Sequence, residues 1–297
     1  MAELSYEGKV AIVTGAGNGL GREHAMLLAS RGAAVVVNDL GGTVAGVGAD
    51  LTAAETVVKE IEALGGVAVA DGHSVATQEG GAAIVQAAID AFGRIDIVVN
   101  NAGILRDKSF HNLTPELLDP VIDVHLYGTI WVTQPAFVRM REQGYGRIVN
   151  TSSAAGIFGN FGQVNYGAAK MGVVGITRVL ALEGAKYNIN VNAIAPMART
   201  RMTEELLGPV AEKLDPARVA PVVAYLCHES CALTSRIFSV GGGRVAEIFI
   251  GVTKGFTSPT LDIEAVQDNL EAICDRDGYI TPMQANDEIG FVLQALG

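Results

Sequence analysis

Short apolar runs alternate with longer amphipathic segments through most of the chain. The apolar runs are rich in Val, Ile and Ala and occupy residues 9–13, 34–38, 67–70 and 95–99. Runs of this kind are typical of parallel strands that are buried on both faces. Helical patterns follow the first three runs, at residues 22–31, 51–64 and 78–92. This alternation predicts an α/β fold with a doubly wound parallel sheet of Rossmann type.

The second half of the chain continues the pattern less regularly. It shows a long helical stretch at 120–140, strands at 147–150 and 190–196, a further strand within 233–240, and short helices at 261–274 and 286–296. We expect residues 1–243 to form a Rossmann-type dinucleotide-binding and catalytic domain. Residues 244–297 are expected to form a C-terminal helical extension that packs on the active site or on a subunit interface, in its own subunit or a neighbouring one.

Composition narrows the class of protein. The chain is 49% hydrophobic and 18% charged, which favours a well-filled core over disorder. A net charge of −11 argues against a nucleic-acid surface. No apolar run reaches the length of a membrane span, the first residues do not resemble a signal peptide, and three cysteines make no even disulfide framework. We therefore expect a cytoplasmic protein without a metal site, because Cys227, His228 and Cys231 form an incomplete zinc set.

A glycine-rich turn follows the first strand. Gly15, Gly19 and Gly21 are spaced Gly-x-x-x-Gly-x-Gly, and a helical pattern begins directly after them. Glycines at such a turn allow the backbone to approach a pyrophosphate at the N-terminus of a helix. The strand before the turn and the helix after it are the context that this interpretation requires. The turn therefore predicts dinucleotide binding.

An acidic residue ends the second strand. Asp39 can accept hydrogen bonds from the adenosine ribose, and its charge would repel a 2′-phosphate. Asn18 rather than a basic residue precedes Gly19, whereas Arg22 is close enough in sequence to leave NADP open. These residues favour NAD. Ser74, Asn101 and Ser153 also follow strands, so we expect them at the same edge of the sheet as Asp39.

Tyr166 and Lys170 are four residues apart on a predicted helix, so they share one face. The phenol of tyrosine has a pKa of about 10, which an adjacent ammonium group lowers. A bound oxidised nicotinamide would contribute further positive charge. Ser153 has a hydroxyl that can hold the substrate oxygen. These three residues are the candidate catalytic set, although Tyr-x-x-x-Lys alone also occurs by chance on amphipathic helices.

The motifs taken together and in this order resemble the short-chain dehydrogenase/reductase family over residues 6 to 245. The resemblance implies that Tyr166 is the general base in oxidation, that Lys170 lowers its pKa and binds the nicotinamide ribose, and that Ser153 polarises the reacting oxygen. It also implies homodimers or homotetramers. The expected contacts with NAD are Gly15, Asn18, Gly19, Leu20, Gly21, Asp39, Ser74, Val75, Asn101, Ala102, Gly103, Tyr166, Lys170, Pro196, Ala198 and Thr200. The expected contacts with substrate are Ser153, Phe158, Phe161 and Gln163.

A narrower resemblance concerns residues 37–42, 156–163 and 226–231, together with the tail. These segments are similar to the dehydrogenase portions of peroxisomal multifunctional enzymes of type 2, and imply a free-standing bacterial-type counterpart. That branch oxidises (3R)-3-hydroxyacyl-CoA with NAD and also acts on 17β-hydroxysteroids, so the expected substrate is an acyl-CoA, of a fatty acid or a steroid side chain, or a steroid. An NADPH-dependent 3-ketoacyl reductase and a non-enzymatic dinucleotide-binding protein are the alternatives.

Two positions depart from the family pattern. His125 stands where the family usually has an asparagine whose main chain holds a relay water. We interpret His125 as a tolerated variant packed in a helical interface, with a second acid/base group as the alternative. Met197 follows Pro196 where a glycine is usual. The relay to Lys170 and the contacts after Pro196 are therefore less firmly predicted than the catalytic set.

Overall fold

The computed structural model describes residues 3–199 and 208–296. It divides into two units, Met1–Glu247 and Ile248–Gly297. The first unit extends past the expected boundary at residue 243, because a further short strand begins at Arg244. That strand, RVAEI, has too few apolar residues for the sequence pattern to reveal it.

A parallel sheet forms the centre of the first unit. Within the described residues it has eight strands in the order β3-β2-β1-β4-β5-β6-β7-β8. Their bounds are β1 Val10–Thr14, β2 Ala34–Asn38, β3 Val67–Asp71, β4 Ile97–Asn100, β5 Gly146–Thr151, β6 Ile189–Met197, β7 Ile237–Gly241 and β8 Arg244–Ile248. The pairs from β3 through β7 are all parallel. The strand order reverses between β1 and β4, where doubly wound folds bind their ligands. The predicted fold class is confirmed.

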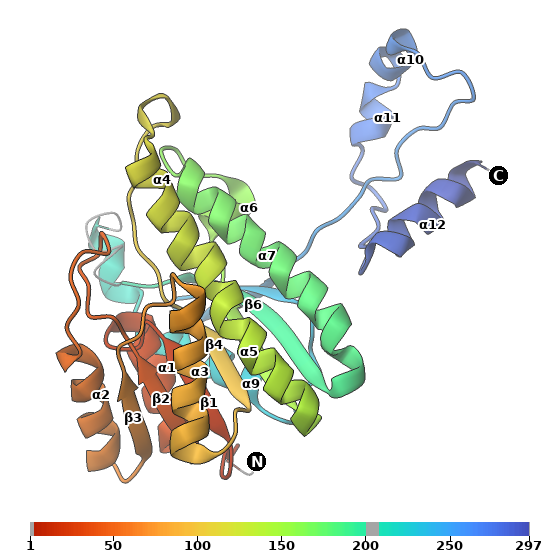
Figure 1. Cartoon of the computed structure of the whole chain (residues 1–297). Helices are drawn as coiled ribbons and strands as arrows, with labels where there is room; N and C mark the ends of the chain where they lie inside the picture. The colour runs from red at the N-terminus through yellow and green to blue at the C-terminus, as the bar shows by residue number, and fades with distance from the viewer. Residues whose placement is uncertain (1–2, 200–207, 297) are drawn as a thin grey trace. The chain divides into compact units, whose positions relative to one another are not determined.

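Helices cover both faces of this sheet (Figure 1). On one face α1 contacts α2 and α9, whereas on the other α3, α5 and α7 lie side by side. The bounds of the longer helices are α1 Gly19–Ser30, α2 Thr52–Ala63, α3 Gln78–Phe92, α4 Pro115–Ile122, α5 Gly128–Gln143, α7 Val164–Gly184 and α9 Ala220–Cys227. Shorter helical segments are η1 Phe110–Asn112, α6 Ala154–Phe158, η3 Ala185–Tyr187, η4 Gly208–Lys213 and η5 Pro216–Arg218.

The core explains why the strands read as continuous apolar runs. Every residue of β1, β4 and β5 is buried, so neither side of these strands requires polar residues. Ile12 and Val98, for example, are fully buried on adjacent strands. Burial of one such side chain contributes roughly 1.5–3 kcal/mol. The sheet is thereby a rigid base for the loops that follow its strands.

The long helical stretch predicted at 120–140 is not one regular helix. A π-helical turn, η2 (Asp123–Tyr127), joins α4 to α5. A π turn inserts an extra residue into the helical ladder and changes the direction in which side chains point. His125 lies in this turn and is buried. The hydrophobic period of the sequence does not reveal such an insertion, which occurs next to the candidate site.

The second unit contains helices α10 (Ile263–Asp268), α11 (Leu270–Cys274) and α12 (Ala285–Leu296). Asn269 separates α10 from α11, where a single helix was expected. A bridge between Val252 and Ile280 and stacked rings of Phe249 and Tyr279 hold its connecting segments. How this extension packs stays a prediction. In the described ranges, no helix has the length and apolar character needed to cross a bilayer, and no cluster of three His, Cys, Asp or Glu side chains suits a metal ion.

Candidate active site

A cavity of about 680 Å³ lies at the carboxyl ends of β1 to β6. It brings together most of the residues that the sequence singled out. Those that line it are Gly15, Asn18, Gly19, Leu20, Asp39, Ser74, Val75, Asn101, Ala102, Gly103, His125, Ser153, Phe158, Gln163, Tyr166, Lys170, Pro196 and Ala198. Gly21 and Phe161 do not line it, and Thr200 lies outside the described residues.

The glycine-rich turn is fixed against the end of β4. Gly15 and Gly19 have φ angles of +63° and +53°, a backbone region that favours glycine. The side-chain amide of Asn101 donates hydrogen bonds to the carbonyl oxygens of Thr14 and Gly15, at 3.0 and 3.1 Å. The hydroxyl of Thr14 accepts from the amides of Asn101 and Ala102. Asn101 therefore positions the turn, and Thr14, which was not among the predicted site residues, holds the backbone of Asn101 and Ala102 in place.

The N-terminus of α1 has the features of an anion site. Among the described residues, Asn18 makes no side-chain capping bond, and no acidic residue lies in the first turn of α1. The first amide groups of a helix have no partner within it, and the helix dipole favours a negative charge there. The residues present therefore fit a pyrophosphate. Gly21 has a different role, since a Cβ atom on it would collide with the carbonyl oxygen of Gly15.

Asp39 connects the glycine-rich turn to the loop after β2. Its Oδ2 atom accepts from the amide of Gly17 at 2.8 Å, and its Oδ1 atom accepts from the amide of Gly41 at 2.7 Å. Each carboxylate oxygen retains a lone pair for a further donor. Asp39 is thus held in a fixed orientation and can still accept hydrogen bonds from a ribose. At the end of β3, Ser74 and Val75 form the neighbouring wall of the cavity.

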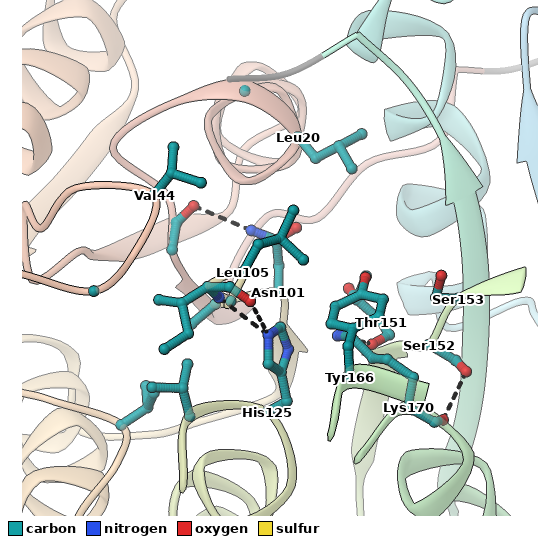
Figure 2. Close-up of a pocket in the computed structure, with 18 of the residues that line it drawn as sticks. Leu20, Val44, Asn101, Leu105, His125, Thr151, Ser152, Ser153, Tyr166 and Lys170 are labelled. Carbon is teal, nitrogen blue, oxygen red and sulfur yellow. Dashed lines mark hydrogen bonds between the residues drawn. The ribbon is translucent and has the colours of Figure 1, made fainter. Parts of the chain in front are cut away.

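Tyr166 and Lys170 lie one turn apart on α7 and meet Ser153 at the end of β5 (Figure 2). The Nζ atom of Lys170 donates to the carbonyl oxygen of Thr151 at 2.6 Å and lies 5.6 Å from the centre of the Tyr166 ring. The Oγ atom of Ser153 accepts from the amide of Ala155, so its O–H group remains able to donate. The predicted catalytic set is brought together in space.

Burial dominates the electrostatics of this group. Burial raises the pKa of Tyr166, and the charge of Asp107 also raises it. A hydrogen bond with Ser153 acts in the opposite direction and lowers this pKa, but its effect is smaller than that of burial. Burial also lowers the pKa of Lys170 to about 7, because a buried ammonium group loses hydration. Tyr166 is therefore not tuned for proton transfer by the chain alone, and the charge of Lys170 changes with pH around neutrality. Additional positive charge in the cavity would favour the phenolate form of Tyr166.

His125 packs edge-to-face against Tyr166, with ring centres 5.1 Å apart. Its Nε2 atom lies 3.0 Å from the amide nitrogen and 2.8 Å from the carbonyl oxygen of Ile104, and the tautomer decides which bond forms. Burial, and then the charge of Lys170, keeps the pKa of His125 well below its usual value, so the ring is neutral. This geometry assigns His125 a positioning contact. Its catalytic role stays a prediction.

The expected substrate contacts differ in their surroundings. Phe158 lines the cavity, whereas Phe161 is 92% exposed and lies outside the lining. Gln163 lines the cavity, but its Nε2 atom donates to Asp107 at 2.6 Å and its Oε1 atom accepts from Asn160 at 3.0 Å. Both polar groups of this amide therefore have protein partners. The geometry favours Phe158 as a substrate contact and gives Gln163 a structural connection.

The loop after β2 was missed as part of the site. Thr43, Val44 and Gly46 line the cavity. The carbonyl oxygen of Val44 accepts a hydrogen bond from the amide of Leu105, in the segment after β4 (Figure 2). In the sequence this region is a glycine-rich excursion without strand or helix periodicity. Its glycines were a signal for a compact loop, but the partner segment after β4 is distant in the chain. Only the fold brings the two together.

Comparisons with known proteins agree with this site. The family model for short chain dehydrogenases matches residues 9–208. A protein of Mycobacterium tuberculosis named as a short-chain type dehydrogenase/reductase is 56% identical, over 81% of this chain and 84% of its own length. The peroxisomal multifunctional enzyme type 2 of Mus musculus is 47% identical, over 99% of this chain and 40% of its own length.

A solved structure extends the likeness to the fold. The full-length peroxisomal multifunctional enzyme type 2 of Drosophila melanogaster matches with a TM-score of 0.83 and 41% identity, over 99% of this chain and 50% of that one. The chain therefore spans half or less of the length of these two multifunctional enzymes. The matched family model, the identity to these relatives and the shared fold lead to one conclusion. The chain belongs to the short-chain dehydrogenase/reductase family.

Proposed function

We propose that the protein oxidises a secondary alcohol to a ketone with NAD. The proposed substrate is a (3R)-3-hydroxyacyl-CoA, of a fatty acid or a steroid side chain, or a 17β-hydroxysteroid. The observation that carries the proposal is the convergence of Ser153, Tyr166 and Lys170 in one cavity. The chain is similar over 99% of its length to a multifunctional enzyme of type 2, and this similarity supports the substrate class expected from the sequence.

Each catalytic side chain has a role that follows from its contacts. Ser153 uses one lone pair on the amide of Ala155, and its O–H group, which is hydrogen-bonded with Tyr166, can turn to the substrate oxygen when substrate binds. Tyr166 as phenolate accepts the proton of the alcohol. Lys170, anchored to the carbonyl of Thr151, places positive charge near the phenol when it is protonated, and in that form it stabilises the phenolate. A bound oxidised nicotinamide would supply the hydride acceptor and additional positive charge in the cavity.

The contacts of Arg22 and Asp39 support NAD over NADP. Arg22 was the residue that left NADP open, and its guanidinium is paired with Glu60 at 2.6 Å and Glu23 at 2.5 Å. It does not line the cavity. Asp39 does, and a second negative charge from a 2′-phosphate beside its carboxylate would be repelled. The alternative, an NADPH-dependent 3-ketoacyl reductase, has less support, because this chain has Asp39 and not a basic residue at the end of β2.

A homodimer or homotetramer is part of the proposal. Val138 on α5 and Met171, Val179 and Leu182 on α7 are 42–53% exposed, although they are large and apolar. Exposed apolar side chains grouped on two adjacent helices are typical of an interface between subunits. Light scattering after size-exclusion chromatography measures the mass of the assembly. A monomer at micromolar concentration would contradict this part of the proposal.

The proposed activity is tested by a substrate panel. It compares (3R)- and (3S)-3-hydroxyacyl-CoAs of several chain lengths with 17β-hydroxysteroids, each with NAD and with NADP, by absorbance of the reduced dinucleotide. We expect turnover of (3R)-thioesters or of steroids with NAD. A preference for NADP would favour the reductase alternative. No turnover on any member of the panel would favour the non-enzymatic alternative.

A further inference from the structure

Two loops of the cavity are joined by one short segment. We name residues 104–109, which follow β4, the crossbar segment, and residues 40–50, which follow β2, the strap loop. The strap loop lines the cavity on the side of Asp39. Residues 159–163, between α6 and α7, are named the substrate wall, and three of them, Gly159, Asn160 and Gln163, line the cavity on the side of Tyr166. The crossbar segment bonds to both.

The strap loop is compact and closed at its base. The amide of Asp50 donates to the carbonyl oxygen of Leu40 at 2.9 Å, and Gly41 in between bonds to Asp39. A tight turn at its tip bonds Gly46 to Thr43 at 2.8 Å. Loops of this form, with their ends close together, pack as units over functional sites. The loop therefore moves as one piece if its outer contacts are released.

Arg106 is the side chain that fastens this loop. Its Nε atom donates to the carbonyl oxygen of Ala45 at 2.9 Å, and its Nη1 atom donates to the carbonyl oxygen of Glu116 at 2.7 Å. The guanidinium thus links the tip of the strap loop to the start of α4. Beside it, the amide of Leu105 donates to the carbonyl of Val44 at 3.0 Å (Figure 2). Guanidinium bonds are stronger and more directional than neutral ones.

The other end of the crossbar segment holds the substrate wall. The amide of Lys108 donates to the carbonyl of Gly162 at 2.8 Å. Gln163 donates from Nε2 to the carboxylate of Asp107 at 2.6 Å. Arg106 and Asp107 therefore connect the crossbar segment to two different walls of the cavity. Arg106 bonds to the strap loop, on the side of Asp39, and Asp107 bonds to Gln163 of the substrate wall, on the side of Tyr166.

We propose that Arg106 is a positioning residue that keeps the strap loop closed over the bound dinucleotide, and that Gln163 is its counterpart for the substrate wall. Loss of Arg106 would let the dinucleotide leave faster without moving Tyr166 or Lys170. Loss of Gln163 would weaken substrate binding without freeing the dinucleotide. The inference rests on the proposed function only in placing a dinucleotide beside the strap loop.

The first test measures dissociation of NADH from the full chain by stopped-flow fluorescence, with NADPH measured in parallel. Arg106→Gln is expected to raise the dissociation rate about tenfold, which corresponds to about 1.4 kcal/mol. Arg106→Lys should give a smaller increase, because an ammonium group can replace one donor. Gln163→Leu and the matched control Arg139→Gln, whose arginine pairs with Glu142 on the surface of α5, should leave the rate unchanged.

The second test separates the two walls kinetically, and its hydrogen-exchange arm uses the wild-type chain, so it does not depend on any variant folding. Gln163→Leu should raise KM for substrate several-fold while KM for the dinucleotide stays constant, and Arg106→Lys should do the reverse. In the wild-type chain, hydrogen exchange at residues 43–47 should slow when NADH binds. The proposal would be overturned if Arg106→Gln left the NADH dissociation rate unchanged, or if the Arg106 and Gln163 variants changed that rate equally. It would also be overturned if NADH binding did not slow hydrogen exchange at residues 43–47. A wild type that binds the dinucleotide but oxidises nothing would contradict the proposed function instead.

Discussion

Lys170 donates a 2.6 Å hydrogen bond from its buried Nζ atom to the carbonyl oxygen of Thr151, on the strand that precedes Ser153. This bond fixes the ammonium group 5.6 Å from the centre of the Tyr166 ring. Ser152 completes the arrangement, because its hydroxyl donates to the carbonyl oxygen of Lys170 at 2.8 Å. The end of β5 and the first turns of α7 are thus held together beside Tyr166, the proposed base.

Lys170→Met tests the charge at this position. The substitution keeps a similar length and removes the ammonium group, so Tyr166 loses the charge that favours its phenolate. We expect kcat/KM for oxidation to fall by about 10²–10⁴-fold, and the residual activity to rise with pH further into the alkaline range than in the wild type. Steady-state rates from pH 6 to 10 measure both. A loss that is uniform at every pH would point to a binding role alone.

Asp39→Ser tests the choice of dinucleotide. The serine removes the charge that would repel a 2′-phosphate, so we expect the ratio of kcat/KM for NAD to that for NADP to fall at least about tenfold. Absolute rates should fall as well, because Asp39 also holds Gly17 and Gly41. Arg22→Gln is the control, since that guanidinium is committed to Glu60 and Glu23. An unchanged ratio in Asp39→Ser would contradict the role given to its carboxylate.

His125→Asn tests whether the histidine is an acid/base group. Burial keeps the pKa of His125 well below its usual value, so its neutral ring does not titrate between pH 6 and 8. We expect the asparagine variant to keep turnover within a few-fold and to keep the shape of its pH profile. His125→Ala should cost about 1–3 kcal/mol of folding free energy, because Ile104 loses a buried partner. Loss of an acidic limb in His125→Asn would restore the catalytic alternative.

His24 on α1 links stability to pH. It is buried, its two ring nitrogens have no hydrogen-bond partner among the described residues, and burial lowers its pKa to about 3. The unfolded chain binds the proton at about pH 6.5 and below, so folding stability is complete above that pH and falls as pH drops toward 3, by at most about 1.4 kcal/mol per unit.

His24→Leu removes the titrating group while it keeps an apolar side chain in the core. We expect the variant to lose less stability than the wild type between pH 6.5 and 4, measured as the free energy of unfolding in urea at each pH. Equal slopes for the two proteins would show that other groups account for acid destabilisation.

Much of the fold was predictable because buried parallel strands leave a direct pattern in the sequence. The runs that became β1, β2 and β4 are buried on both faces and needed no polar side. The helix at residues 78–92 was predicted with the bounds that the structure gives. Asp39, Ser74, Asn101 and Ser153 could be grouped because each follows a strand, and parallel strands end at one edge. The cavity lining includes all four of these residues.

Other features depend on contacts between distant segments and left no such pattern. The π turn at His125 adds one residue to a helix without changing its apolar spacing in a recognisable way. The bonds from Arg106 to Ala45 and Glu116 go to main-chain oxygens, which have no sequence signature. Phe161 was expected to face substrate because it lies in the glycine-rich run, yet local turns expose it. Predicted positions were most reliable where one element alone determined them.

Tyr166→Phe is the most direct test of the central claim, that Tyr166 is the base of an NAD-dependent alcohol oxidation. The measurement compares wild type and variant in oxidation of a (3R)-3-hydroxyacyl-CoA or the best substrate of the panel, with NADH binding followed by fluorescence in both. The variant keeps the ring and its contact with His125 and loses only the hydroxyl. We expect turnover to disappear while NADH binds with unchanged affinity. Undiminished turnover in Tyr166→Phe would contradict the mechanism.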